Sequence, residues 1–218
     1  MLSIVIPTLN ADDHLPACLD AVRGDNEIVV VDGGSADASA VVAEAAGARV
    51  VRTARGRGTQ LRAGAETARG DWLLFLHADT RLGAGWRETA AMYMASRPGA
   101  PACFRFRLDD DAWQARIIER GVAARARLLG LPYGDQGLLV SRERYEAAGG
   151  YRDLPLMEDV DLVRRLRRVR VLDADAITSA ARWRRDGWFR RSARNAVCLG
   201  LYRAGVPVHR IARVYSPS

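Results

Sequence analysis

The chain has 218 residues, of which 49% are apolar and 27% are charged, and this composition is typical of a soluble globular protein. A chain of this length can form one domain with a sizeable core, and no apolar run approaches the ~18 residues that a membrane-spanning helix needs. All 33 basic residues are arginine, so the sequence excludes a lysine-dependent phosphate loop and Schiff-base lysine chemistry.

The first half of the sequence alternates predicted strands and helices. Short apolar runs that end in turns predict four strands, at residues 2–6, 27–31, 48–52 and 72–76. Helices are expected between them, the first capped by Asp12 or Asp13, the second over 38–46 capped by Ser35 or Asp37, and the third reaching about Ala68. This alternation predicts an α/β fold with a mostly parallel central sheet and helices on both faces.

The second half is less regular. Its alternating, apolar and amphipathic patterns predict a half-exposed strand at 102–108, a helix at 113–129, a short strand at 137–141, a helix at 158–168, an edge strand at 169–172 and closing helices at 188–204 and 208–214. The apolar positions of the helix at 113–129 include Ile117, Val122 and Leu128. Without a repeat or a low-complexity linker, a single domain over 1–218 is expected.

Polar or flexible residues follow four of the predicted strands, at Pro7-Thr8, Asp32-Gly33, Arg55–Gln60 and His77–Asp79. Ligands bind at the carboxyl ends of strands in open parallel sheets. Each motif alone also has an ordinary structural explanation, as a turn or a helix cap. Together they favour a nucleotide site in which Asp32 accepts a hydrogen bond from the imide N–H of a nucleotide base. In that site the Gly-Arg-Gly loop would approach a diphosphate, and Asp79 would offer a hard oxygen ligand to Mg²⁺ or Mn²⁺.

Two further clusters are candidates for chemistry. Glu158, Asp159 and Asp161 follow a Pro-Leu-Met loop; they fit an acidic first helical turn that the helix dipole favours. An aspartate at such a junction can also act as a general base if it faces an acceptor hydroxyl. Tyr133-Gly-Asp-Gln-Gly137 is the third candidate, and a plain turn explains it equally well.

Charge is unevenly distributed along the sequence. Residues 1–110 carry 12 arginines against 14 acidic residues, whereas residues 111–218 carry 21 against 12. The basic half favours a phosphorylated substrate or an anionic membrane surface over nucleic acid, because no nucleic-acid motif accompanies it. At Trp188-Phe-Arg-Arg191, core packing with a solvated arginine face is favoured over an interfacial helix. The N-terminus shows no basic leader and the three cysteines are far apart, so a cytoplasmic protein with reduced thiols is expected.

The motifs together resemble those of the bacterial family 2 glycosyltransferases, which have the GT-A (nucleotide-diphospho-sugar transferase) fold and act by inversion on nucleotide sugars. The matching segments, in the family's order and spacing, are Ser3–Asn10, Val30–Ser35, His77-Ala-Asp79 and Met157-Glu-Asp159. Four segments also resemble a short subgroup associated with arsenosugar biosynthesis and radical-SAM enzymes: Gly56-Arg-Gly58, Leu74–Thr80, Tyr133–Gln136 and Thr178-Ser179. The resemblance covers nearly the whole chain.

The resemblance implies a role for individual residues. The nucleotide-sugar-binding residues would be Pro7, Thr8, Asn10, Asp32, Gly33, Arg57, Gln60, His77 and Ala78. Asp79 matches the metal-binding second acid of the family's Asp-x-Asp motif, and Asp159 matches the catalytic base, with Glu158 beside it. The residues on the acceptor or diphosphate side would be Asp135, Gln136, Arg182 and Trp183. By the same resemblance, residues 1–110 form the nucleotide-sugar-binding half and residues 111–218 the acceptor-binding half.

Two departures from the family pattern matter. His77 stands where the first acid of Asp-x-Asp would be, which leaves metal binding to Asp79 and phosphate oxygens. Ser179-Ala-Ala-Arg182-Trp183 keeps the Arg-Trp of the processive members but lacks their Gln, which argues against a processive polysaccharide synthase.

The expected activity is therefore metal-assisted transfer, with Mn²⁺ or Mg²⁺, of a sugar from a nucleotide-diphosphate donor, a UDP-sugar in particular, to the hydroxyl of a small-molecule or lipid-linked acceptor. No nucleic-acid partner is expected, and peripheral membrane contact and the oligomeric state stay open. Two alternatives are a sugar nucleotidyltransferase, whose Gly-rich basic loop is absent after the first strand, and a catalytically idle nucleotide-binding protein.

Overall fold

The computed structural model of the chain describes residues 1–97 and 99–215. The strands are β1 (Leu2–Thr8), β2 (Glu27–Asp32), β3 (Arg49–Arg52), β4 (Trp72–Phe75), β5 (Thr80–Leu82), β6 (Ala102–Leu108), β7 (Leu138–Ser141) and β8 (Arg170–Thr178). The α-helices are α1 (Leu15–Val22), α2 (Ser39–Ala45), α3 (Arg57–Thr67), α4 (Trp86–Ser96), α5 (Trp113–Leu129), α6 (Arg142–Ala147), α7 (Glu158–Leu166), α8 (Ala181–Asp186), α9 (Trp188–Arg203) and α10 (Val208–Tyr215). A 3₁₀ turn, η1 (Gly134–Gln136), precedes β7.

One eight-stranded sheet runs through both halves of the chain, in the order β3-β2-β1-β4-β7-β6-β8-β5. Strands β1 to β4 pair in parallel, and Thr8 at the end of β1 lies opposite Asp32 at the end of β2. The expected parallel arrangement of the first half is therefore confirmed. Strand β7 is antiparallel to both β4 and β6, whereas β6 and β8 are parallel.

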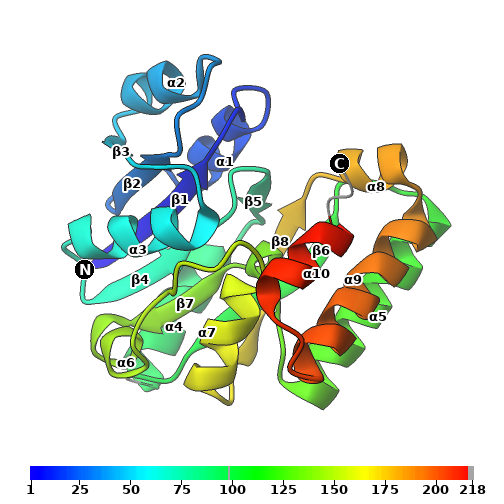
Figure 1. Ribbon diagram of the computed structural model, residues 1–218. Coiled ribbons are helices and arrows are strands. Elements are labelled where there is room, and N and C mark those ends of the chain that lie inside the picture. Colours follow the sequence, from blue (N-terminus) through cyan, green and yellow to red (C-terminus); the bar gives the residue numbers. More distant parts are fainter. Residues whose placement is uncertain (98, 216–218) are drawn as a thin grey trace.

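Helices cover both faces of the sheet (Figure 1). One core lies between the sheet and helices α1, α2 and α4, and it includes Ile4, Leu74 and Phe104. The other lies between the sheet and helices α3, α6, α7, α9 and α10, and it includes Val5 and Leu162. Strand side chains alternate between the two cores, which is why the central strands are almost continuously apolar.

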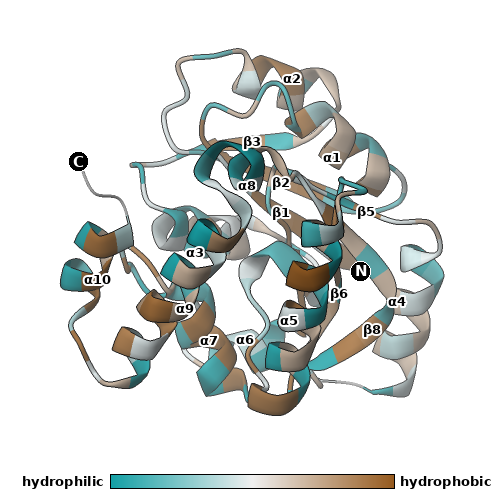
Figure 2. Ribbon diagram, turned by 90° about the vertical axis from the view of Figure 1, so that its right-hand side faces the viewer, coloured by the Kyte–Doolittle hydropathy of each residue, from teal (hydrophilic) through white to brown (hydrophobic). Residues whose placement is uncertain are grey.

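A third, smaller core fixes the C-terminal helices to the sheet. Phe106 and Leu108 at the end of β6 pack with residues of α5 and with Trp183 of α8. Helices α5 and α9 lie side by side on this flank of the molecule (Figures 1 and 2). No helix within the described ranges is long and apolar enough to cross a membrane.

The structure corrects several details of the sequence-based assignment. The predicted edge strand at 169–172 is wrong in place and in length, because β8 has nine residues and lies inside the sheet between β6 and β5. Asp12 and Asp13 do not cap α1, whose N-cap residue is His14 without a side-chain bond. Instead, Asp12 Oδ2 accepts a hydrogen bond from Ala38 N at 3.4 Å, at the start of α2. Strand β6 is more buried than expected, with only Arg105 exposed.

Candidate functional site

Two adjoining cavities open where β1 and β4 end. The first, called the donor cleft here, is lined by Pro7, Thr8, Leu9, Asn10, Ala11, His14, Arg55, Gly56, Arg57, Gln60, His77, Ala78, Asp79, Pro155, Leu156, Glu158, Arg182 and Tyr215. The second, called the inner cavity, is lined by Arg57, His77, Asp79, Tyr133, Asp135, Leu156, Met157, Asp159, Val160, Thr178, Arg182, Trp183, Arg191, Asn195 and Tyr215. The two cavities share six residues, which form their junction: Arg57, His77, Asp79, Leu156, Arg182 and Tyr215.

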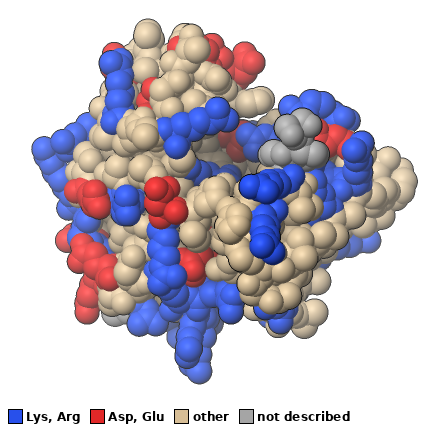
Figure 3. All heavy atoms as spheres, viewed as in Figure 1, with Lys and Arg blue, Asp and Glu red and all other residues tan. Residues whose placement is uncertain are grey.

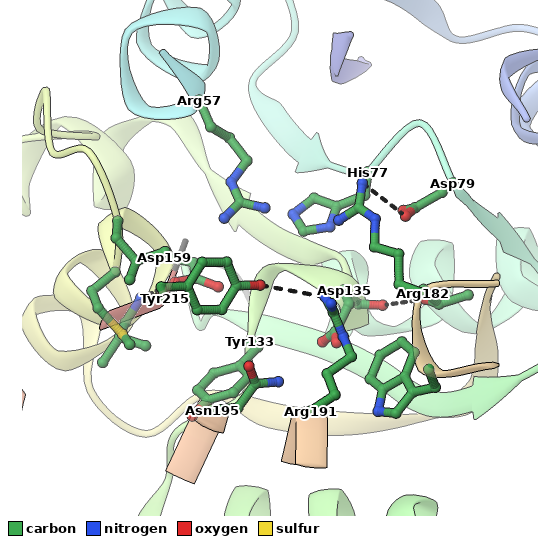
Figure 4. Close-up of a pocket in the computed structure, with 15 residues that line it drawn as sticks. Arg57, His77, Asp79, Tyr133, Asp135, Asp159, Arg182, Arg191, Asn195 and Tyr215 are labelled. Atoms are coloured by element: carbon green, nitrogen blue, oxygen red, sulfur yellow. Dashed lines mark hydrogen bonds and ion pairs between the residues drawn. The ribbon is translucent and has the colours of Figure 1, made fainter. Parts of the chain in front are cut away.

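The chain after β4 carries the polar residues of the junction. Figure 4 shows Arg57, His77 and Asp79 facing Asp135 and Arg191 across the inner cavity. The Asp79 carboxylate pairs with Arg182 at an Nη2–Oδ2 distance of 3.6 Å. Burial, followed by the nearby Arg57, lowers the pKa of His77 to about 4, so that its imidazole is neutral at pH 7.

The start of α3 provides a buried ion pair. Arg57 donates from Nε to Glu158 Oε1 at the start of α7, and the Glu158 side chain is only 1% exposed. Burial raises the pKa of Glu158, and Arg57 beside it acts in the opposite direction. The pair joins α3, from the first half of the chain, to α7 and aligns the residue that follows, Asp159. Met157 precedes the pair with φ = 64°, a left-handed conformation that non-glycine residues adopt at a cost.

Asp159 is held in place by backbone donors. Its Oδ2 accepts from Gly134 N at 2.7 Å, and its Oδ1 accepts from Val160 N at 2.7 Å. A Cβ at Gly134 would lie 2.6 Å from His77 Nε2, so a glycine allows the η1 turn to fit between His77 and Asp159. The predicted motif around Tyr133–Gly137 is therefore part of the site.

Asp135, in the same turn, lines the inner cavity together with Asp79 and Asp159. Its Oδ1 is buried and has no hydrogen-bond partner among the described residues. Burial raises the pKa of Asp135 to about 6, with Asp159 and Asp79 contributing in the same direction. A carboxyl group with these properties can bind a ligand hydroxyl or accept a proton from it near neutral pH.

The C-terminal helices close the inner cavity. Buried Arg191 on α9 donates to Asp186 Oδ2 at 2.9 Å, and its guanidinium lies over the Trp183 ring at 4.9 Å. Arg191 Nε, Trp183 Nε1 and Asn195 Oδ1 are buried without a partner in the described chain. Buried polar atoms without partners are rare, so their position at one cavity is consistent with a polar ligand there.

Most of the predicted site residues come together at the two cavities, but three do not line either. Asp32 is buried and accepts from Gly34 N and Ser35 N, both at 3.2 Å, and Gly33 follows it in that turn. Gln136 donates from Nε2 to Phe104 O at 3.1 Å and points into the sheet. Gln60 does line the donor cleft, yet its Nε2 bonds the main-chain oxygens of Thr8 and Val31 at 2.9 and 2.8 Å, so it supports the cleft floor.

Sequence reasoning missed the contributions of Arg191, Asn195 and Tyr215. These residues lie in α9 and α10, which carry no motif, and they reach the site only because the helices pack back against the sheet. Arginines gather over α8 at the upper right of the space-filling view (Figure 3). An excess of arginine after residue 110 was the only sequence feature that could have indicated this part of the site.

Comparison with known proteins gives the family. The model of the family described as "Glycosyl transferase family 2" matches residues 3–145. A PGL/p-HBAD biosynthesis glycosyltransferase of Mycobacterium bovis BCG is 43% identical over 93 residues, covering 38% of this chain and 36% of that protein. An uncharacterized glycosyltransferase of Mycobacterium tuberculosis is 36% identical over 85 residues, covering 38% of this chain and 39% of that protein. The match thus spans little more than a third of these relatives' lengths.

Solved structures show the same fold. The mannosyltransferase PcManGT of Pyrobaculum calidifontis, in complex with GDP-Man and Mn²⁺, superposes with a TM-score of 0.67 at 16% identity, covering 98% of this chain and 69% of that one. S. aureus TarS in complex with UDP-GlcNAc gives 0.62 at 15% identity, covering 81% and 58%. Mycobacterium tuberculosis glucosyl-3-phosphoglycerate synthase with Mn²⁺, UDP and phosphoglyceric acid gives 0.54 at 20% identity, covering 78% and 67%. The chain has the GT-A fold and belongs to glycosyltransferase family 2.

Proposed function

We propose that the chain is an inverting glycosyltransferase that moves a sugar from a nucleotide-diphosphate sugar, in particular a UDP-sugar, to an acceptor hydroxyl. The observation that carries the proposal is the junction at which the donor cleft, with Asp79, meets an inner cavity that is also lined by the carboxylates of Asp135 and Asp159. A sugar at this junction would have its anomeric carbon between the diphosphate on one side and the acceptor on the other. That arrangement fits one in-line displacement with inversion.

The proposed roles follow from this geometry. In the donor cleft, Pro7, Thr8 and Asn10 would contact the nucleoside, and Arg57 and Arg182 would grip the diphosphate. In the inner cavity, Asp159 would take the proton of the acceptor hydroxyl while the hydroxyl oxygen forms its bond to the anomeric carbon. The bond from that carbon to the diphosphate breaks in the same step, and the released diphosphate carries the charge that the arginines neutralise.

The residues at the junction fit a divalent cation that is shared with the donor. No three His, Cys, Asp or Glu side chains of the described chain are close enough to hold a metal by themselves. Mg²⁺ is commonly bound by one or two carboxylates together with substrate phosphates, and Asp79 provides one carboxylate at the junction. Mn²⁺ or Mg²⁺ bound there would help to neutralise the negative charge of the leaving diphosphate.

The two cavities also support the proposed division of the chain into a donor half, residues 1–110, and an acceptor half, residues 111–218. Most residues of the donor cleft precede residue 110, and most of the inner cavity follows it. The unpaired atoms of Asp135, Arg191 and Asn195 favour an acceptor that presents hydroxyl groups. We also propose membership of the subgroup associated with arsenosugar biosynthesis, because four residues of its motifs line the cavities: Gly56, Arg57, Tyr133 and Asp135. A cytoplasmic location stays a prediction.

The first test measures donor binding. A thermal-shift panel of nucleoside diphosphates and UDP-sugars, with and without Mn²⁺, should show stabilisation by UDP and UDP-sugars. Release of UDP on incubation with acceptor mixtures would then report transfer, whereas pyrophosphate release from a nucleoside triphosphate would indicate a nucleotidyltransferase instead. Binding of UDP without any release of UDP in the presence of acceptors would favour the idle binding protein.

The second test addresses the base. Asp159→Asn should lower turnover by at least about 100-fold, the usual contribution of general acid–base catalysis, while UDP binding stays close to that of the unmodified chain. Near-normal turnover of this variant would remove Asp159 from the role. In that case, Asp135, which also faces the inner cavity, would be the next candidate.

A further inference from the structure

Exposed apolar side chains are concentrated on two neighbouring helices. Six of the eleven large apolar side chains that are exposed in the described chain lie on α5 and α9: Trp113, Ile117, Leu128, Leu129, Phe189 and Val197. Their exposed fractions reach 61% at Trp113 and 82% at Leu128. Contiguous exposed apolar groups mark interaction sites, whereas scattered ones need no explanation.

Helix geometry places all of these side chains except Leu129 on one side of their helix. Trp113, Ile117 and Leu128 are separated by four and eleven residues, which brings them within a narrow angular range around α5. Phe189 and Val197 are two turns apart on α9. The rings of Trp113 and Phe189 lie 6.0 Å apart and connect the two helices, which run side by side (Figure 2). The surface formed by Trp113, Ile117, Leu128, Phe189 and Val197 is named the outer face here.

The charge of the outer face is of one sign. The exposed charged residues of these two fully described helices are Arg120, Arg127, Arg190 and Arg203. The single acidic residue of α5, Glu119, is buried and bonded to Arg107 and Arg116, and α9 contains no acidic residue. The outer face thus combines large apolar side chains with arginines and exposes no carboxylate from either helix.

We propose that the outer face binds peripherally to an anionic lipid bilayer. Aromatic and aliphatic side chains flanked by arginine are the composition that inserts at the boundary of headgroups and acyl chains, where anionic lipids attract the arginines. A second copy of the chain in a symmetric contact would bring two arginine-bearing faces together, with no exposed carboxylate from α5 or α9 to pair with them. A nucleic acid would use the arginines but would leave Ile117 and Leu128 in water.

The outer face lies on the reverse of the helix that lines the inner cavity. Arg191 and Asn195 of α9 face the cavity, whereas Phe189 and Val197 face outward. A bilayer at the outer face would therefore hold the inner cavity close to the lipid surface. Binding to the bilayer does not depend on the proposed transferase activity, so each can fail without the other.

Vesicle flotation tests the proposal with the full chain. The protein should float with vesicles of phosphatidylcholine and phosphatidylglycerol, bind phosphatidylcholine vesicles far less, and dissociate as salt is raised. The double variant Trp113→Ser/Phe189→Ser should lower partitioning by at least about tenfold, because burial of large apolar side chains provides much of the binding free energy. The control Val41→Ser/Met92→Ser removes two side chains that are exposed to 66% and 67% on α2 and α4, and it should float like the unmodified chain.

Three results would overturn the proposal. The first is no flotation of the unmodified chain with phosphatidylglycerol vesicles at low salt. The second is equal flotation of both double variants, with unfolding temperatures confirming that both are folded. The third is a dimer in light scattering that only the Trp113→Ser/Phe189→Ser variant loses, which would make the outer face a contact between copies. As an independent readout, vesicles should shift the tryptophan fluorescence of the unmodified chain to shorter wavelength. Trp113→Phe should reduce this shift, while the variant still floats with the vesicles.

Discussion

Replacing Arg57 by Gln tests the ion pair that links the two halves of the site. The change leaves the Glu158 carboxylate, which is 1% exposed, without its partner. Removing one partner of a fully buried pair typically costs about 3–5 kcal/mol. Because the Arg57 side chain is 38% exposed, solvent reaches the pair, and a smaller loss of about 2–3 kcal/mol is expected. For a domain of this size, that corresponds to an unfolding temperature lower by roughly 4–12 °C.

The loss should depend on pH with a defined sign. Without Arg57, burial favours the protonated form of Glu158, so its pKa in the folded state lies above its pKa in the unfolded state. The loss of unfolding free energy is then absent when the pH is below the pKa of glutamate in the unfolded chain, about 4.3. It grows as the pH rises above that value. The difference in unfolding temperature between Arg57→Gln and the unmodified chain should therefore be largest near pH 7.5 and shrink toward pH 4.5.

The assay is thermal unfolding of four proteins: the unmodified chain, Arg57→Gln, Glu158→Gln and the double variant. The double variant should recover more than half of the stability lost by Arg57→Gln, because no buried carboxylate is then left unpaired. Equal losses at both pH values, or a double variant less stable than Arg57→Gln, would refute the reasoning. UDP binding by Arg57→Gln should also weaken, since Arg57 lines the donor cleft.

Three other predictions concern the carboxylates and the core. If ionised Asp135 is needed for acceptor binding, kcat/KM should rise with pH around the value of about 6 to which its pKa is raised, and Asp135→Asn should abolish this rise in a pH–rate profile. Mn²⁺ should increase the thermal stabilisation by UDP, and Asp79→Asn or a chelator should remove that increment without removing stabilisation by UDP alone. Gly64→Ala would place a Cβ 2.3 Å from Val5 Cγ1, and it should lower the free energy of unfolding by denaturant by about 1–3 kcal/mol. Gly121→Ala, whose Cβ would have no atom within 4 Å, should instead stabilise α5 by about 0.5–1 kcal/mol.

The first half of the fold could be predicted because β1, β2 and β4 are largely buried on both faces. Such strands are continuous apolar runs, and the turns that follow them carry the polar residues of the donor cleft. The short strand β5, Thr80–Leu82, could not be predicted from three residues. Strand β5 pairs with β8, so β8 lies inside the sheet and not at its edge. Because β5 was not predicted, the strand predicted at 169–172 was placed at the edge.

The positions of candidate residues could be predicted where chain order alone brings them together. His77 and Asp79 follow β4, and Asp159 is the second residue of α7, so each could be located from the strand or helix beside it. Arg191 and Asn195 could not, because their positions depend on how α9 packs across the sheet. The same limit applies to Ile117 and Leu128, whose apolar character does not distinguish a core face from the exposed face that they occupy.

The charges at the junction favour a histidine at position 77 over the acid that the family motif usually places there. Asp79 and Asp135 already face one another's charge, and the pKa of Asp135 is raised to about 6. Another carboxylate beside Asp135 would raise the pKa of Asp135 further, in addition to the effect of burial, and would favour its protonated form. A neutral His77 avoids this repulsion, and Arg57 and Arg182 provide positive charge at the same junction. In this arrangement the arginines would stabilise the leaving group together with a cation held by one carboxylate, so losing Arg182 should impair turnover even when Mn²⁺ is saturating.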